Sequence, residues 1–216
     1  GYAAMRTVHL IRPGRTECNH DDPVRDRIRG WGNMELSQLG QKEAVRLAFI
    51  IQNKALEGYA LEMLYTSDLL RARQTAHVIA ARNDLPMIAT ADFRPWNTGD
   101  YAGKSASEVV PVLARYAQQD PNRPVPGGES FDAFRLRYFS GLVVAIRDCR
   151  NTFGIVTHHR NERLLKAWQK AGYPLDGSID EDEFCRKGSP TGHHEVISIP
   201  EDRLERVVEM RSGVWA

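Results

Sequence analysis

Short β-forming runs alternate with capped helical segments along this chain, and this alternation constrains the fold more than any other sequence feature. Residues 8–11 form an apolar run that stops at Pro13-Gly14, a strong turn signal. Ser37 can then cap a helix whose apolar positions recur mostly at intervals of three and four. Strands and helices that alternate in this way favour a three-layer α/β/α sandwich with a mainly parallel sheet and a single core.

The same alternation extends over the rest of the chain. Further strands are predicted at 61–65, 153–157, 196–199 and 204–210, and further helices at 67–81, 105–117, 130–146 and 161–171. The breaker-rich stretch 121–128 must be a loop. We expect residues 5–216 to form a single domain and residues 1–4, which precede Met5, to be a cloning remnant.

Charge and composition exclude several classes of protein. Lys and Arg number 29 and Asp and Glu number 28, so the net charge of +1 gives no electrostatic hold on a nucleic-acid polymer or an anionic membrane. No apolar stretch approaches the roughly 18 residues that a membrane span needs, and no signal peptide is evident. Cys18, Cys149 and Cys185 lack CxxC spacing, which argues against a disulfide framework and a zinc site. We expect a cytoplasmic protein.

Residues capable of chemistry gather in two loops that follow predicted strands. Arg12, Arg15, Thr16 and Asn19 follow the first strand, and residues 158–163 follow a later one. Guanidinium forks, a hydroxyl and an amide form the donor set that a phosphate needs, and ligands of such sheets sit beyond the carboxyl ends of the strands. Taken alone, the first loop is more typical of a solvated turn.

A series of motifs in order resembles the histidine phosphatase superfamily, the phosphoglycerate mutase-like proteins. These motifs are Leu10 to Asn19, Gly30-Trp31 with Leu36 to Ala44, Tyr65 to Ala76, Gly99 to Lys104, Pro126 to Ser130, and Ile155 to His158. The most specific is Ser67-Asp68-Leu69-Leu70-Arg71-Ala72-Arg73-Gln74-Thr75-Ala76, and the resemblance runs from about residue 6 to 165. It implies the phosphoglycerate mutase-like form of the α/β fold.

The resemblance also implies roles for particular residues. Arg12, Arg71 and His158 fall on positions that bind the transferring phosphoryl group, and Asn19 matches a further phosphate contact. Two guanidinium groups and an imidazole suit the equatorial oxygens of that group on chemical grounds as well. The implied partner is a phosphorylated small molecule or phosphoprotein, with no cofactor. Dimers are common in the family, but nothing in this chain's own pattern establishes a homodimer.

Prolines occupy both positions at which the family carries its catalytic groups. Pro13 stands where the resemblance implies a phosphorylated histidine, and Pro95 where it implies a general-acid glutamate. Proline has no nucleophilic ring nitrogen and no proton to give, so the phosphohistidine route is closed. A double change to proline favours natural divergence over a designed knockout. We therefore predict binding of a phosphorylated ligand with little or no turnover by that route.

An active phosphomonoesterase is the first alternative. It would use His158 or His159 as nucleophile and Asp100 or Glu129 as acid. Each also has a simpler explanation: Asp100 is a solvated turn residue, Glu129 caps or salt-bridges near a helix start, and His159 fills space. A protein-interaction module is the second alternative, and it would expose an apolar patch near Trp168 or Trp215.

The predicted mouth of the site is basic. It comprises Arg15, Thr16, Asp100, Glu129 and His159, with further arginines near the motifs at Arg94, Arg160 and Arg163. Arg15 replaces a glutamate usual in the family, which suits a ligand with a second phosphate or a carboxylate, such as a nucleotide or sugar phosphate. Surface solvation explains isolated arginines equally well.

Histidine pairs raise the question of a metal. His193-His194 can be taken with His158-His159 or with His20-Asp21-Asp22, but the spacing follows no known ligand pattern. The resembling family needs no metal, and we expect none here.

Overall fold

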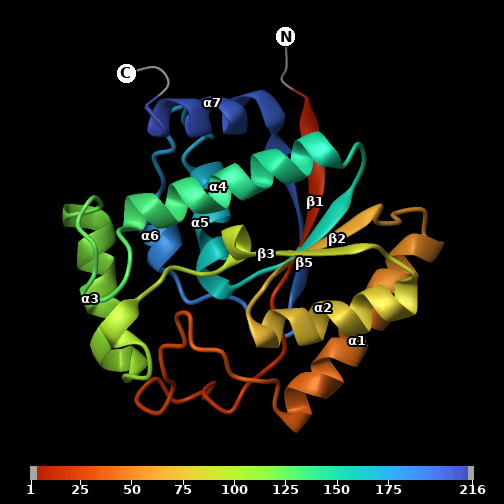
Figure 1. Cartoon of the computed structure of the whole chain (residues 1–216), viewed down its shortest axis with the longest axis horizontal. Helices are drawn as coiled ribbons and strands as arrows, with labels where there is room; N and C mark the ends of the chain where they lie inside the picture. The colour runs from red at the N-terminus through yellow and green to blue at the C-terminus, as the bar shows by residue number, and fades with distance from the viewer. Residues whose placement is uncertain (1–3, 214–216) are drawn as a thin grey trace.

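The computed structural model describes residues 4–213, in which a five-stranded sheet lies between two layers of helices (Figure 1). In chain order the elements, with η marking short 3-10 helices, are β1 (Met5–Ile11), α1 (Gln38–Leu56), β2 (Met63–Ser67), α2 (Leu70–Asn83), β3 (Met87–Thr90), η1 (Ala91–Phe93), η2 (Gly99–Tyr101), α3 (Ala106–Gln119), α4 (Phe131–Asp148), β4 (Phe153–Val156), α5 (His159–Lys170), α6 (Glu181–Cys185), β5 (His194–Pro200) and α7 (Glu201–Arg211). This is the three-layer arrangement that the alternation predicted.

The sheet is mainly parallel, and β1 lies beside β4 at its centre. The strand order is β3-β2-β4-β1-β5, and β5 alone among these strands runs antiparallel to its neighbour. Val8 pairs with Phe153 and Ile11 with Val156, so β1 and β4 end at the same edge of the sheet. The loops that follow these two strands therefore meet there, as does the start of α2 after β2.

Apolar side chains cover both faces of the sheet. On one face, Leu47 and Ile51 of α1 and Ile79 of α2 pack with Val156. On the other face, α4, α5 and α7 supply a core rich in aromatic rings, which includes Phe131, Phe134, Tyr138, Phe139 and Trp168. Full burial of a side chain such as Phe139 contributes about 1.5–3 kcal/mol. These aromatic residues are core, as their helical spacing indicated.

One predicted element was wrong, and another begins later than expected. Residues 204–210, expected to be a strand, belong to helix α7, where Leu204 and Val207 are buried three positions apart on one face. Pro200 ends β5, and two acidic residues at the start of α7 suit the positive end of a helix dipole. The helix expected to start at Ser67 begins at Leu70, because Ser67 completes β2 and its hydroxyl accepts from the Leu69 amide at 3.3 Å.

Two short elements were not anticipated. The edge strand β3 has four residues, most of them exposed. A strand this short, with no buried face, shows no alternation of apolar and polar residues in the sequence. Helix α6 has five residues. None of the helices in residues 4–213 has the length and apolar character to cross a bilayer. That residues 5–216 form one domain stays a prediction.

Candidate functional site

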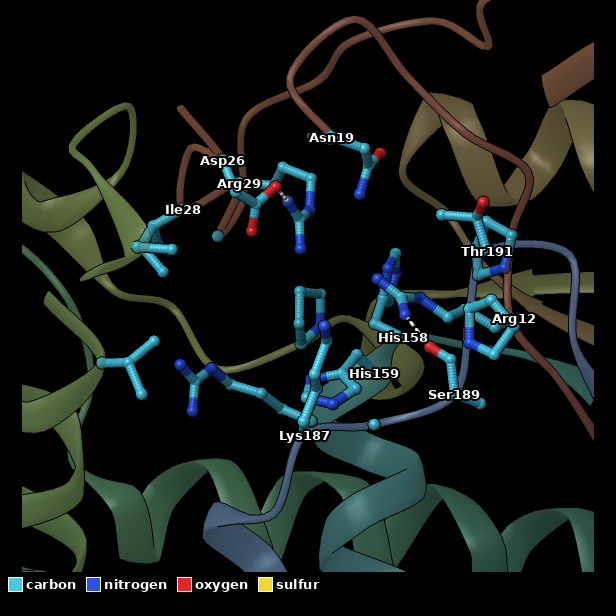
Figure 2. A pocket seen from close by; sticks show the side chains of 18 of the residues that line it. Arg12, Asn19, Asp26, Ile28, Arg29, His158, His159, Lys187, Ser189 and Thr191 are labelled. Carbon is cyan, nitrogen blue, oxygen red and sulfur yellow. Dashed lines mark hydrogen bonds and ion pairs between the residues drawn. The ribbon is translucent and has the colours of Figure 1, made fainter. Parts of the chain in front are cut away.

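A cavity of about 590 Å³ opens at the carboxyl edge of the sheet (Figure 2). Its lining includes Arg12 and Pro13 after β1, Arg71 on α2, and His158 and His159 after β4. These residues come from three strand ends that are adjacent only in the folded sheet. The convergence expected from the two strand-end loops is therefore present, with the start of α2 as a third contributor.

Two arginines of this cavity make no ion pair with a carboxylate in the described chain. Arg71 donates from Nη1 to the Gly32 carbonyl at 2.6 Å and from Nη2 to the Gly30 carbonyl at 3.1 Å. Arg12 donates from Nη1 to the Ser189 carbonyl, a contact drawn in Figure 2. Carbonyl oxygens fix the direction of these guanidinium groups but leave their charge uncompensated. An anion would compensate it.

Burial and crowding weaken the hold of these arginines on their protons. Burial, with a smaller contribution from the charge of Arg29, lowers the pKa of Arg12 to about 10 and that of Arg71 to about 9. Both groups remain cationic at neutral pH. A bound anion would raise both pKa values, since it favours the charged form.

His158 and His159 are neutral members of the same cavity. Burial lowers the pKa of each well below its ordinary value, with further lowering chiefly by Arg71 for His158 and by Arg12 for His159. The Nε2 atom of each ring is buried without a hydrogen-bond partner. Such an atom donates to an anion or accepts a proton according to the tautomer.

Asn19 presents its amide nitrogen to the cavity because its amide oxygen is used within the loop. The backbone N–H and the hydroxyl of Thr16 both donate to Asn19 Oδ1, each at 2.9 Å. In Figure 2 the amide nitrogen points into the cavity. Thr16, predicted at the mouth, is buried and does not line the cavity, so its part is to orient Asn19.

The other predicted mouth residues divide into two groups. Arg15 and His159 line the cavity, whereas Asp100 and Glu129 do not. Glu129 Oε1 accepts from Arg137 Nη2 at 2.6 Å and from the Asn97 amide at 2.9 Å. Asp100 is an exposed residue of η2. The simpler explanations considered for these two carboxylates fit their surroundings, and neither faces the cavity as an acid.

Pro13 and Pro95 both line the cavity. The Pro13 carbonyl accepts from the Gly192 amide at 3.0 Å, and the Pro95 carbonyl accepts from Trp31 Nε1 at 2.8 Å. Neither ring carries a group that can transfer a proton or attack phosphorus. The two prolines therefore shape the cavity wall without supplying a reactive atom.

Sequence reasoning missed three parts of the cavity wall: residues within 23–29, the face of α3, and the segment 186–191 between α6 and β5. The Ser189 hydroxyl donates to both carboxylate oxygens of Glu162, at 2.8 and 3.0 Å, and Thr191 bonds in the same way to Glu43. A Cβ on Gly188 would lie 1.8 Å from the His159 ring. In the sequence, the glycine at 188 is the one local signal of a close approach, and it does not reveal that the neighbour is His159.

A different group of side chains has the geometry to hold a metal ion. Within the described residues, Glu162, His193 and Glu195 offer ligand atoms within 4.8 Å of one another. Lys166 Nζ lies 2.7 Å from Glu195 Oε2, so an ammonium already balances part of this charge. Neither His158-His159 nor His20-Asp21-Asp22 belongs to the group.

The apolar patch considered for a protein-interaction module does not form at Trp168. That side chain is fully buried, and its Nε1 donates to the Pro174 carbonyl at 2.9 Å. The prediction for Trp168 was wrong, because a ring on the inner face of α5 packs against Phe139 of α4. Trp215 lies outside the described residues.

The fold and the cavity define an α/β protein with a basic pocket at the carboxyl edge of a mainly parallel sheet. The chain belongs to the histidine phosphatase superfamily (branch 1), whose pattern it matches over residues 8–177. The resemblance in the motifs and the phosphoglycerate mutase-like fold are both confirmed.

Similar proteins include mutases and phosphatases. The chain is 33% identical over 107 residues to a 2,3-bisphosphoglycerate-dependent phosphoglycerate mutase of Bartonella tribocorum, a match that covers 48% of each chain. It is 31% identical over 129 residues to a glucosyl-3-phosphoglycerate phosphatase of Mycolicibacterium vanbaalenii, covering 58% of this chain and 53% of that one. The matched stretch thus spans about half the length of these relatives.

Solved structures share the fold. A mycobacterial glucosyl-3-phosphoglycerate phosphatase in complex with VO3 superimposes with a TM-score of 0.67 at 21% identity, covering 88% of this chain and 92% of the other. At this identity the likeness establishes the fold alone. Related proteins of this fold have thus been captured with phosphate-like anions.

Proposed function

We propose that this protein binds a phosphorylated small molecule or phosphoprotein in the cavity, with little or no turnover through a phosphohistidine. The observation that carries the proposal is the pair Arg12 and Arg71, a half-buried and a buried arginine whose guanidinium groups donate to carbonyls and form no ion pair with a carboxylate in residues 4–213. The amide of Asn19 and the ring of His158 add donors around the same space. A mycobacterial glucosyl-3-phosphoglycerate phosphatase of this fold has been solved with VO3 and with inorganic phosphate, which supports the choice of anion.

The two prolines support the second half of the proposal. Pro13 follows Arg12 where the family motif has its nucleophile, and Pro95 takes the position of the acid. Loss of a nucleophile alone lowered kcat by roughly 10⁶ in a serine protease. A pocket that keeps its anion donors but lacks both groups binds better than it reacts.

The decisive experiment compares binding and turnover in three proteins. Binding of inorganic phosphate is measured by calorimetry, and phosphate release from a panel of nucleotides and sugar phosphates is followed in parallel. We expect the parent to bind phosphate without release, Arg71→Ala to lose binding, and Pro13→His with Pro95→Glu to gain release. Arg73→Ala, an exposed arginine on the same helix, is the matched control.

Two results would contradict the proposal. One is phosphate affinity that is unaffected by Arg71→Ala. The other is rapid release by the parent protein that depends on Arg71.

A working phosphomonoesterase is the second candidate, and one observation favours it. His158 is neutral, and its Nε2 is buried without a partner inside the cavity, which is the state that a nucleophilic imidazole requires. Attack by Nε2 would form a P–N bond while the ester oxygen departs with a proton from water. Release that is abolished by His158→Asn, together with a phosphorylated histidine detected by mass spectrometry, would establish this candidate.

A further inference from the structure

Arg160 is a cation of the cavity for which the described chain provides no partner. It is half-buried, lines the cavity from the first turn of α5, and makes no hydrogen bond or ion pair with residues 4–213. Its guanidinium lies 5.9 Å from the centroid of the fully buried Trp96 ring. Burial lowers the pKa of Arg160 to about 10. Desolvating a cation without a partner is unfavourable, so an anionic ligand at this point would gain from pairing with it.

The surroundings of Arg160 are apolar. Ala106, Val110 and Ala114 follow one another at intervals of four on α3 and all line the cavity, so one face of that helix is turned towards it. Val110 is 39% exposed, so its side chain is open to a ligand in the cavity. Trp96 and Phe184 continue this surface, and the ring of Phe131 contacts both of them.

Ile28 belongs to the same apolar core cluster as Ala106 and Trp96, and it shows where this apolar surface lies relative to Arg12. In Figure 2, Ile28 stands on the opposite side of the cavity from Arg12, Ser189 and Thr191. Arg29, paired with Asp26 at 3.0 Å, lies between the two sides. The charges that influence Arg160 are those of Arg29 and Cys185, and those that influence Arg12 are Arg29 and acidic side chains. Arg12 and Arg160 therefore differ in their charged neighbours, apart from Arg29.

The charge of the whole lining agrees with a ligand that carries more than one anionic group. Seven arginines and lysines line the cavity against two aspartates, Asp21 and Asp26. Asp21 pairs with Arg15 and Asp26 with Arg29, so neither is available to Arg160. A single phosphoryl group at Arg12 and Arg71 would leave Arg160 without a partner.

We propose that the cavity binds a phosphate monoester whose body is apolar and whose far end carries a second anionic group, a carboxylate or a second phosphate, that pairs with Arg160. The phosphoryl group occupies the inner end of the cavity, at Arg12 and Arg71. The body of the ligand lies against Val110 and the α3 face, and the far anion pairs with Arg160 near Trp96. This inference rests on the proposed function, because it takes the inner end as the phosphoryl site.

Three rigid probes test it. Dissociation constants are measured by calorimetry for phenyl phosphate, para-carboxyphenyl phosphate and para-phenylene bisphosphate, with inorganic phosphate as the reference. We expect both doubly anionic probes to bind roughly tenfold more tightly than phenyl phosphate, because each adds a charge-assisted hydrogen bond. A preference for one of these two probes identifies whether the far anion is a carboxylate or a phosphate.

Variants then assign the preference to Arg160. Arg160→Gln should abolish the tenfold preference and leave the affinity for phenyl phosphate unchanged, whereas Arg115→Gln, an exposed arginine of α3, should keep the preference. Because Arg160 has no hydrogen bond or ion pair to lose, and its guanidinium lies as far as 5.9 Å from the Trp96 ring centroid, Arg160→Gln should fold and melt at about the same temperature. Val110→Asn, which adds no charge, should weaken all aryl probes but not inorganic phosphate.

The outcomes separate this inference from the function beneath it. If phosphate and phenyl phosphate bind in an Arg71-dependent way but the second anionic group adds no affinity, the Arg160 site is wrong and the proposed function stands. If the preference exists but survives Arg160→Gln, the assignment to Arg160 is likewise wrong. If neither phosphate nor phenyl phosphate binds, both fail.

Discussion

The inner and outer ends of the cavity are built in different ways. At the inner end, Arg12 and His158 directly follow adjacent strands, and Arg71 opens the helix after a third strand. At the outer end, Val110 belongs to a helix that is not part of the sheet edge, and Arg160 makes no hydrogen bond or ion pair with residues 4–213. The difference teaches that arginines hydrogen-bonded near the strand ends fix the donors for one small anion, whereas the face of α3 and an arginine without such bonds shape the space for what is attached to it.

The largest expected effect comes from removing the charge at the inner end. Arg71→Ala should weaken binding of inorganic phosphate by about a hundredfold, because it deletes a cation that pairs directly with the anion. Arg71→Lys should fall between the parent and Arg71→Ala, since it keeps the charge but loses the fork. Calorimetry measures the phosphate affinity of each variant. Equal affinities for the parent, Arg71→Ala and Arg71→Lys would show that the inner end does not hold the anion.

A change at the wall between the two ends should have the next largest effect. Gly188→Val places a side chain where a Cβ already lies 1.8 Å from the His159 ring, so the ring or the segment must move. We expect a loss of about 1–3 kcal/mol in unfolding free energy. Phosphate affinity should also fall. Pro190→Ala, at an exposed neighbouring position, is the control, and a Gly188→Val protein with unchanged melting temperature would rule out the close contact.

Releasing the cation between the two ends should strengthen binding. Asp26→Asn removes the carboxylate that pairs with Arg29 at 3.0 Å and keeps an oxygen for the His20 amide. Phosphate should bind about threefold more tightly at low salt, and the gain should shrink as salt screens the charges. Asp22→Asn, whose residue does not line the cavity, should show no gain. A gain that persists at high salt would point to a cause other than charge.

The last expected effect is on stability rather than on phosphate binding, and it concerns the support of the inner end. Burial, followed by a hydrogen bond with Glu195, raises the pKa of Glu162 from 4.5 to about 7. Ionised Glu162 is less favourable in the folded chain than in the unfolded chain, so its ionisation lowers the free energy of unfolding. This loss of stability grows from pH 4.5 to about 7 and is constant above that pH. Glu162→Gln should therefore raise the melting temperature by a few degrees at pH 8 and leave it unchanged near pH 4.

The control for that measurement is Glu17→Gln, a change at an exposed position. An equal shift at both pH values would mean that the effect of Glu162→Gln comes from packing rather than from ionisation.

Predictability from the sequence follows the same division between the two ends. The strands at 8–11 and 153–157 and the Arg71 motif depend on local patterns, and the carboxyl edge of a parallel sheet then brings them together. The strand predicted at 204–210 failed because its valines favour a strand while its apolar spacing fits a helix. Propensity and periodicity conflicted there, and packing against α4 decided the outcome.

The segment 186–191 could not be predicted because its partners are remote. Ser189 meets Arg12 across 177 positions of sequence, and no local pattern encodes such a contact. Asp100 and Glu129 lie near motif residues in the sequence yet outside the cavity, since a neighbouring position in the chain does not fix the direction of a side chain. Arg160 was identified as near the pocket, but its lack of a partner is a property of the folded chain alone.

The pairing of β5 with β1 has a consequence for the order in which the cavity forms during folding. The Arg12 amide donates to the His193 carbonyl at 2.9 Å, and the Gly192 amide donates to Pro13. During synthesis the arginines and histidines of the cavity leave the ribosome well before residues 189–193, so nascent chains lack the wall that closes around them. The proposed phosphate capture would therefore appear only when β5 has emerged and docked, which makes it a reporter of the docking of β5.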